Sequence, residues 1–218
     1  MNMQKIKLTL TLLLVTLVSA IGFAQDAKAL LDEVSAKVRS YDNIYIEFRY
    51  NLNNTKENVN QDARGDVTIS GENYVLNMLG TTSIFDGTNS YVIVPEDEEV
   101  TISPYNPEDE KSVTPSRMLT FYEKGYRYQN DITQNVKGRK IQFVKLMPID
   151  NQAEIKDILL GIDVQTKHVY KLIQTDDNGT KFTLTVQNFK TNQPISETLF
   201  SFNEEKYEEM GYYINRLD

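Results

Sequence analysis

From Asp42 onward, apolar and polar residues alternate with a period of two through most of the chain. In residues 43–52, NIYIEFRYNL, the apolar side chains of Ile44, Ile46 and Phe48 fall on one side, and charged side chains fall on the other. Successive side chains of a strand point to opposite faces of a sheet, so this alternation predicts half-buried strands rather than helices. A sheet therefore dominates any fold that this chain can adopt.

Turn signals divide the alternating region into short strands. Asp86-Gly87 and Asp177-Asn178-Gly179 each stand between two apolar runs, and glycine tolerates the positive φ that a tight hairpin requires. The spacing predicts about ten to eleven strands in sequential antiparallel order, and a sheet of that extent must curl. The predicted strands are residues 43–52, 66–70, 73–79, 82–85, 90–94, 100–103, 126–129, 140–146, 156–163, 168–175 and 181–189, and residues 198–203 are a candidate last strand.

Two segments have helical spacing instead. In residues 26–40 apolar residues recur every three or four positions with charged residues between them, and Asp26 is a suitable N-cap. Thr114 is an N-cap followed by proline, and Gly125 ends the short helix predicted over residues 115–124. We expect an α+β fold, mostly antiparallel β: an incomplete (half) β-barrel whose hollow face is covered by the N-terminal helix and the short lid helix.

Residues 1–24 have the pattern of an export signal. Lys5 and Lys7 precede an apolar run that ends with small residues at Ala24. We expect cleavage after Ala24 and an exported, mature single domain, residues 25–218. The alternative is an uncleaved membrane anchor, for which the run is short and contains three threonines and a serine.

The composition argues against several classes of protein. The net charge is −8, and removal of Lys5 and Lys7 with the signal changes it to −10, because the first 24 residues contain no acid. Such acidity argues against binding to nucleic acid or to anionic membrane surfaces, since both select basic patches. The chain has no cysteine, so it has neither a disulfide framework nor a cysteine for lipid attachment.

Catalytic and metal-binding signals are weak. His168 is the sole histidine and stands in a strand pattern without cysteine partners, so we expect a surface or structurally satisfied side chain. The acidic runs at residues 95–99 and 107–111 lack the alternating ligand spacing of a calcium loop, and we expect solvated turns. We also expect Arg49, Arg64 and Arg117 to be solvated. Hydrolase motifs are absent from the sequence, and we predict no enzymatic activity, no cofactor and no metal.

Several segments, taken in order, carry a family resemblance. They are the helix DAKALLDEVSAKVRS with the strand after it, RGDVTISGENYVLNM, the hairpin IFDGTNSYVIVPEDEEV, the lid-like VTPSRMLTFYEKGY, and closing strands from IQFVKLMPID to ETLFSF. Their order and spacing resemble the periplasmic outer-membrane lipoprotein carrier family, LolA, in the divergent form found in Bacteroidetes-like sequences. The resemblance implies an incomplete barrel that accepts the acyl chains of a lipoprotein released from the inner membrane and passes them to an outer-membrane acceptor.

The same resemblance implies the partners: acylated lipoproteins, an inner-membrane release complex and an outer-membrane acceptor. We expect a monomer that binds no nucleic acid.

The sequence departs from the family at two places. The well-studied proteobacterial members have an arginine in the strand matching ENYVLNM, where it ties the lid to the barrel, and this stretch has no basic residue. The chain also has no tryptophan, and Tyr91 stands near a position that is often tryptophan in the family.

The apolar faces of the predicted helices and strands give a candidate acyl-binding surface. Met118 is favoured because flexible thioethers suit adaptable apolar surfaces, whereas each of the other residues is also compatible with ordinary core packing. The predicted lining residues are Leu30, Leu31, Val34, Val38, Ile46, Phe48, Tyr50, Tyr74, Leu76, Met78, Phe85, Ile93, Met118, Leu119, Tyr122, Phe143, Leu160 and Leu184.

A second function is open on the same fold: an envelope-stress sensor or protein-binding module. In that case the acidic, tyrosine-rich segment NEEKYEEMGYY, residues 203–213, binds a partner. The alternative for this segment is that Tyr207, Tyr212 and Tyr213 pack back onto the sheet. Release of a labelled lipoprotein from inner-membrane vesicles distinguishes a carrier from a sensor.

Overall fold

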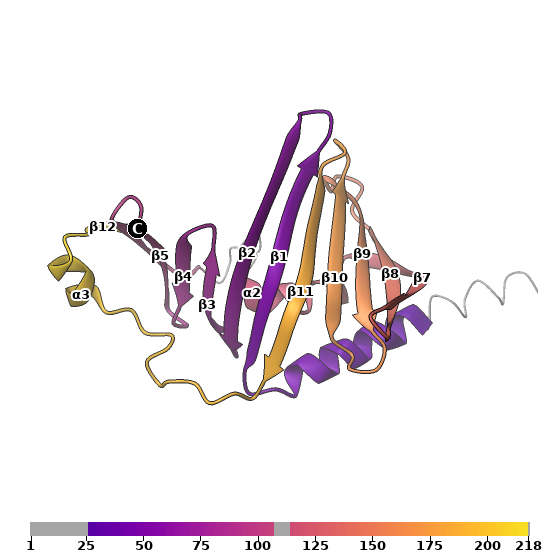
Figure 1. Cartoon of the computed structure of the whole chain (residues 1–218), viewed down its shortest axis with the longest axis horizontal. Helices are drawn as coiled ribbons and strands as arrows, with labels where there is room; N and C mark the ends of the chain where they lie inside the picture. The colour runs from indigo at the N-terminus through magenta and orange to yellow at the C-terminus, as the bar shows by residue number, and fades with distance from the viewer. Residues whose placement is uncertain (1–25, 107–113, 218) are drawn as a thin grey trace, which may run out of the picture.

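A computed structural model describes residues 26–106 and 114–217 of the 218-residue chain. The predicted signal sequence and the acidic run at residues 107–111 lie outside the described residues. Twelve strands form one sheet in the order β12-β6-β5-β4-β3-β2-β1-β11-β10-β9-β8-β7 (Figure 1). The strands are β1 (Ile44–Asn54), β2 (Val59–Ser70), β3 (Asn73–Met78), β4 (Thr81–Phe85), β5 (Asn89–Val94), β6 (Glu99–Pro104), β7 (Tyr126–Val136), β8 (Arg139–Pro148), β9 (Ile155–Asp163), β10 (Val169–Asp176), β11 (Lys181–Thr191) and β12 (Tyr213–Arg216).

The sheet consists of two antiparallel meanders joined in its middle. β1 to β6 follow one another toward one edge, and β7 to β11 follow one another from the other edge. β1 and β11 pair antiparallel from Ile44–Thr191 to Asn53–Lys181, which joins the two halves. Sequential order therefore holds within each half but not across the join. β12 and β7 form the two edges, so the sheet stays open and the predicted α+β half-barrel is confirmed.

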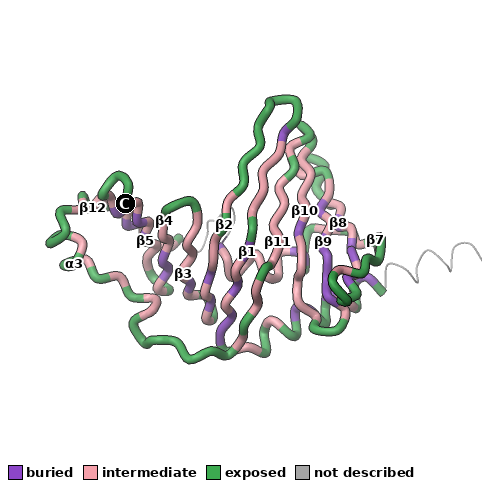
Figure 2. The backbone as a smooth tube through the Cα atoms, viewed as in Figure 1, coloured by how far each residue is buried: buried purple, intermediate pink, exposed green. Residues whose placement is uncertain are grey.

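The first hairpin is longer than the sequence pattern predicted. β1 continues to Asn54 and β2 begins at Val59, whereas the sequence predicted strands that end at residue 52 and resume at residue 66. Polar cross-strand contacts such as Asn51–Asn60, with a 3.0 Å hydrogen bond, hold this outer part together. Because both faces are polar there, the apolar alternation that marks a strand is missing. Figure 2 shows that the tip of this hairpin is exposed.

The N-terminal helix, residues 26–39, runs along the half of the sheet formed by β7–β11 (Figure 1). Its apolar stripe is buried, with exposed fractions of 0% for Ala27, 2% for Leu31 and 0% for Val34. The stripe packs on a core cluster from β8, β9 and β10 that contains Val144, Leu146, Ile158, Leu160, Ile162 and Leu172. The helix predicted from apolar spacing is thus present, with its apolar side on the sheet. No helix among the described residues is long and apolar enough to cross a membrane.

The lid consists of α2 (Pro115–Met118) and a 3-10 turn, η1 (Phe121–Glu123). Thr114 caps α2 as predicted, and its hydroxyl accepts a hydrogen bond from the Arg117 N–H at 3.3 Å. The single helix predicted over residues 115–124 is interrupted after Met118. A helix of that length is marginal by itself, so packing decides its path, and the bend buries Tyr122 to an exposed fraction of 1%.

The C-terminal segment covers the opposite face at the β3–β6 end of the sheet. Residues 192–203 lead to α3 (Glu204–Glu209), and β12 then adds in parallel to β6 (Figure 1). The Phe202 ring stacks between those of Tyr91 and Tyr207, with centroid distances of 4.6 and 5.2 Å. Residues 198–203 are therefore turns and irregular chain rather than the candidate strand, because Phe202 packs onto the face of the sheet.

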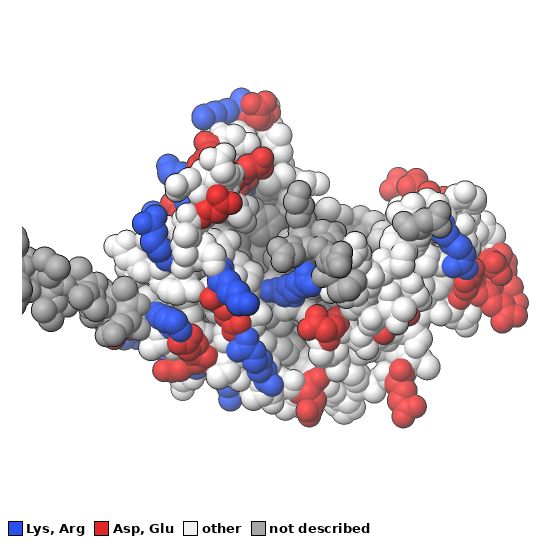
Figure 3. Space-filling view, turned by 180° about the vertical axis from the view of Figure 1, so that it is seen from behind, with Lys and Arg blue, Asp and Glu red and all other residues white. Residues whose placement is uncertain are grey.

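The tyrosine-rich segment divides between packing and exposure. Tyr207 and Tyr212 pack with the core cluster of Ile84, Tyr91, Ile93, Val100 and Ile102, whereas 67% of Tyr213 is exposed. Acidic side chains gather at this end of the molecule (Figure 3), where α3 has the sequence EEKYEE. The segment is thus an integral part of the fold with an acidic outer surface.

Candidate functional site

An apolar cavity of about 190 Å³ lies between the curved sheet and its helical covers. Side chains from β1, β2, β3, β9, β10 and β11 form its walls, and the last turn of the N-terminal helix and the lid form its roof. The lining residues are Val38, Ile46, Phe48, Tyr50, Val67, Ile69, Leu76, Met78, Pro115, Met118, Leu119, Phe121, Tyr122, Leu160, His168, Val169, Leu172, Phe182, Leu184, Val186 and Phe189.

Strand pairing makes the wall continuous. Phe48 pairs with Val186 and Tyr50 with Leu184 where β1 meets β11. Paired residues project from the same face and their side chains touch. The rings of Tyr50 and Phe182 extend the contact, with centroids 4.9 Å apart. The join between the two meanders is therefore also the floor of the cavity.

The lid closes the cavity with apolar side chains and one buried phenol. Met118, Leu119, Phe121 and Tyr122 all border the hollow. Burial raises the pKa of Tyr122 to about 12, so its hydroxyl stays neutral. That hydroxyl accepts a hydrogen bond from the Ser35 hydroxyl at 3.1 Å, which leaves the cavity side of the ring apolar.

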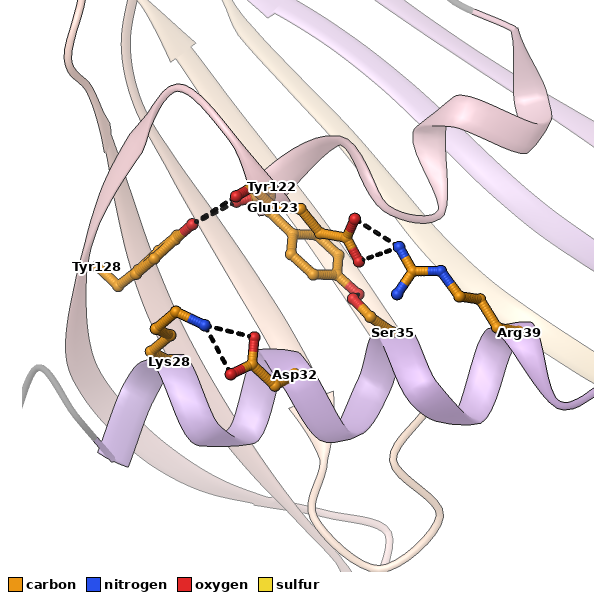
Figure 4. A network of polar contacts seen from close by, with 7 residues as sticks. All are labelled: Lys28, Asp32, Ser35, Arg39, Tyr122, Glu123 and Tyr128. Atoms are coloured by element: carbon orange, nitrogen blue, oxygen red, sulfur yellow. Dashed lines mark hydrogen bonds and ion pairs between the residues drawn. The ribbon is translucent and has the colours of Figure 1, made fainter.

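Polar contacts tie the lid to the N-terminal helix (Figure 4). The Nη2 atom of Arg39 lies 2.5 Å from both carboxylate oxygens of Glu123. Burial acts to raise the pKa of Glu123, but polar contact with Ser35 and the hydrogen bonds from Arg39 outweigh it, so this pKa lies below its usual value. The Tyr128 hydroxyl donates to the Tyr122 carbonyl at 2.8 Å. A helix arginine thus ties the lid here, in a chain whose matching strand lacks the family's arginine.

The other end of the lid contacts the β2–β6 side. The Ser116 hydroxyl donates to the Glu72 carbonyl at 3.2 Å, and Arg117 Nη2 donates to the Tyr105 hydroxyl at 2.9 Å. The lid therefore bridges the N-terminal helix and the β2–β3 turn. Since these contacts lie on exposed or half-buried groups, we expect each to contribute little to stability.

His168 is the one lining residue with a side-chain nitrogen. Its Nε2 lies 2.7 Å from the Tyr41 hydroxyl, and its ring stacks on Phe189 at a centroid distance of 4.0 Å. Burial lowers the pKa of His168, and Lys37 lowers it further while Asp163 opposes the shift. The histidine is thus neutral near pH 7, half-buried and satisfied by a hydrogen bond.

The structure brings most of the predicted lining residues together, and it places five of the others in packing that adjoins the cavity. Leu30, Leu31 and Val34 lie in or against the core beneath the helix. Tyr74 and Phe85 stack beside the cavity, with centroids 5.8 Å apart. The residues that border the cavity are Val38, Ile46, Phe48, Tyr50, Leu76, Met78, Met118, Leu119, Tyr122, Leu160 and Leu184.

Two of the predicted residues lie on the opposite face of the sheet. Ile93 belongs to the cluster covered by the C-terminal segment. Phe143 alternates with Val144, whose side chain packs under the helix, and Phe143 instead lies over Gly161, where an added Cβ would be 2.8 Å from its ring. Neither borders the cavity, because both strands carry apolar side chains on both faces and the sequence does not show which face is hollow.

Some lining residues were not predicted, although a signal existed for several of them. Phe182 and Val186 alternate in phase with Leu184, and Val67 and Ile69 share a face of β2. Their alternation marks them as candidates once the cavity face is known. The polar tie between Arg39 and Glu123 had no sequence signal, since the two residues are 84 positions apart.

An open half-barrel with an apolar cavity beneath a short lid has the architecture of a binding fold. The family model described as "Outer membrane lipoprotein carrier protein LolA" matches residues 39–203. The chain belongs to this family. No curated protein matches the chain.

Solved structures are similar to the chain at low sequence identity. An uncharacterized conserved protein from Thermus thermophilus has a TM-score of 0.58 at 10% identity, covering 85% of this chain and 98% of that one. A LolA superfamily protein from Nitrosomonas europaea has a TM-score of 0.43 at 12% identity, covering 81% and 97%. The MucA/MucB complex of Pseudomonas aeruginosa gives a TM-score of 0.44 at 15% identity, covering 83% and 62%. The likeness to the Thermus thermophilus protein is one of fold alone.

Proposed function

We propose that this protein is an exported, periplasmic carrier that binds the acyl chains of lipoproteins in its cavity and moves them from the inner to the outer membrane. Family membership supports the class of cargo. The observation that carries the proposal is the lining itself, which is apolar apart from one histidine and the tyrosine hydroxyls. Such a lining favours hydrocarbon over any polar ligand.

The size of the cavity indicates a closed state. An apolar cavity of about 150 Å³ holds a molecule the size of benzene, so a cavity of about 190 Å³ holds only a short piece of an acyl chain. The lid and the helix must therefore move apart before a whole chain enters. The apolar side chains of the lid and the helix cover each other in the empty protein, and they cover the ligand in the loaded protein.

This competition is what makes release feasible. Each buried methylene contributes about 0.8 kcal/mol, so three chains of roughly 45 methylenes in all could yield on the order of 36 kcal/mol. Non-covalent affinities saturate near about 20 kcal/mol. Opening the lid separates apolar surfaces of the protein that cover each other, and this costs free energy. Part of the free energy gained by burying the acyl chains offsets that cost, so the net affinity is lower and the cargo can leave.

Extraction from membranes tests the proposal. We expect the mature protein to release a labelled triacylated lipoprotein from inner-membrane vesicles into solution. A Leu76→Trp variant, which fills the cavity, should lose this activity, whereas Ile132→Trp on the exposed β7 edge should keep it. If the wild type released nothing but bound an envelope protein, the sensor function would replace the carrier function.

A further inference from the structure

Half of β2 has an unpaired edge. Its residues from Gly65 to Ser70 pair with β3, but residues 59–64 pair only with β1. Figure 1 shows the β1–β2 hairpin rising above the β3–β4 hairpin, and Figure 2 shows its exposed outer part. An unpaired strand edge presents a row of N–H and C=O groups that can pair with another extended chain.

The hairpin register shows which backbone groups face outward. Ser70 and Asn73 flank the two-residue loop Gly71-Glu72, in which Gly71 has φ +58°. The pair that flanks such a loop is hydrogen-bonded, and hydrogen bonding alternates along each strand, so the even-numbered residues of β2 face the β3 side. Beyond β3, the residues whose N–H and C=O face the open side are Asn60, Asp62 and Arg64.

A hollow of about 740 Å³, called the notch below, lies under this edge, where β3 ends. Arg64, Gly65, Met78 and Leu79 are among its lining residues. Phe48 and Met78 border both this notch and the apolar cavity, so the two hollows share a wall.

Gly65 thins that shared wall. It is the last residue of β2 that pairs with β3, opposite Met78. A Cβ at Gly65 would lie 2.6 Å from the Phe48 ring, so glycine lets the ring lie flat over the strand. Phe48 and Met78 are therefore the side chains that lie between the notch and the cavity.

We propose that the segment of the cargo lipoprotein directly after its acylated N-terminus binds to the free edge of β2 as an added strand. This inference rests on the proposed carrier function. When the acyl chains enter the cavity through the shared wall, the residues that follow the acylated terminus lie in the notch, directly below Arg64. The backbone then continues along the edge and pairs with Asp62 and Asn60.

The chemistry of the edge fits a carrier of many different proteins. Backbone pairing provides affinity that does not depend on the cargo sequence. Arg49 is paired with Asp62 at 3.0 Å, whereas Arg64 has no ion-pair partner in the described part of the chain. Arg64 is therefore available to an acidic side chain or a polar group of the added strand.

Two substitutions at one position separate the backbone from the side chain. Asp62→Pro removes an outward N–H and leaves the pairing of β2 with β1 intact, because proline is tolerated on a free edge. Asp62→Ala removes the same carboxylate and keeps the N–H, so it is the matched control. Thermal unfolding of both variants checks that the hairpin remains folded.

The probes are two diacylated lipopeptides, one of two residues and one extended by ten alternating serine and threonine residues. We expect the extension to tighten binding about tenfold in the wild type and in Asp62→Ala, and to have no effect in Asp62→Pro. All three proteins should bind the short lipopeptide equally.

Equal affinities of the wild type for both lipopeptides, or equal gains in both variants, would overturn the strand-addition inference and leave the carrier function standing. Absence of binding to either lipopeptide would overturn both. A concentration-dependent dimer that Asp62→Pro abolishes would assign the edge to a second copy of the chain instead.

Discussion

The hollow face of the sheet has two parts that differ in their cover. Under the first turns of the N-terminal helix, Val144 and Leu146 of β8 are 0% exposed. On the same face, Leu76 and Leu184 are only half-buried and border a cavity. The apolar alternation is similar in both parts, so strand sequence alone does not produce the difference.

Helix length explains it. The helix over residues 26–39 spans about 21 Å at 1.5 Å per residue. Twelve strands spaced about 4.8 Å apart extend over roughly 50 Å. One helix can therefore seal only part of the face, and the remainder receives only the short lid. The fold thus separates a part that provides stability from a part that stays free to bind.

Matched leucine truncations test this division and should have the largest effect. Leu146→Ala should lower the free energy of unfolding by about 2–5 kcal/mol, because it creates a cavity in a packed core. Leu184→Ala should cost only about 1 kcal/mol, because the side chain already borders a hollow. Urea unfolding of both variants measures the difference, and equal losses would show that the two parts are packed alike.

Filling the cavity should separate binding from stability. Leu76→Trp should weaken binding of a fluorescent fatty acid about tenfold or more, while overpacking changes the unfolding free energy by no more than about 1–3 kcal/mol. Ile132→Trp on the β7 edge is the control. Unchanged fatty-acid affinity in Leu76→Trp would place the ligand elsewhere.

Loosening the lid should have a smaller effect on stability and a clear effect on rate. Arg39→Ala removes the contact with Glu123, where the two side chains are 60% and 32% exposed, so the loss of stability should be below about 1 kcal/mol. Stopped-flow fluorescence should show faster fatty-acid uptake. Lys28→Ala breaks the Lys28–Asp32 pair within the same helix and should leave uptake unchanged. Equal rates in all three proteins would show that this tie does not hold the lid.

The smallest effect is a pH dependence from His168. Because burial lowers its pKa below the unfolded value of 6.5, the unfolded chain binds the proton first as the pH falls. Stability should therefore be complete above pH 6.5 and should decline as the pH drops through the lower, folded pKa. His168→Gln should flatten this decline in urea unfolding between pH 7.5 and 5. An identical decline in the variant would assign it to other groups.

Local sequence signals identified most helices and strands, whereas long-range packing determined how the strands join and which side chains border the cavity. Turn dipeptides and alternation located most strands, and the cap at Thr114 located the lid. The join between β1 and β11 could not be read from local periodicity, because its partners lie more than a hundred positions apart. The tie between Arg39 and Glu123 and the phase of Ile93 and Phe143 depend on that same tertiary arrangement.

The most direct test of the account is to locate a bound acyl chain. A fatty acid with a photoreactive diazirine at its terminal carbon, crosslinked to the mature protein and mapped by mass spectrometry, reports the side chains that surround the chain end. We predict labels on Phe48, Met78 and Met118, which border the cavity. Labels confined to the face formed by Ile84 and Tyr91, or no specific label at all, would contradict the account.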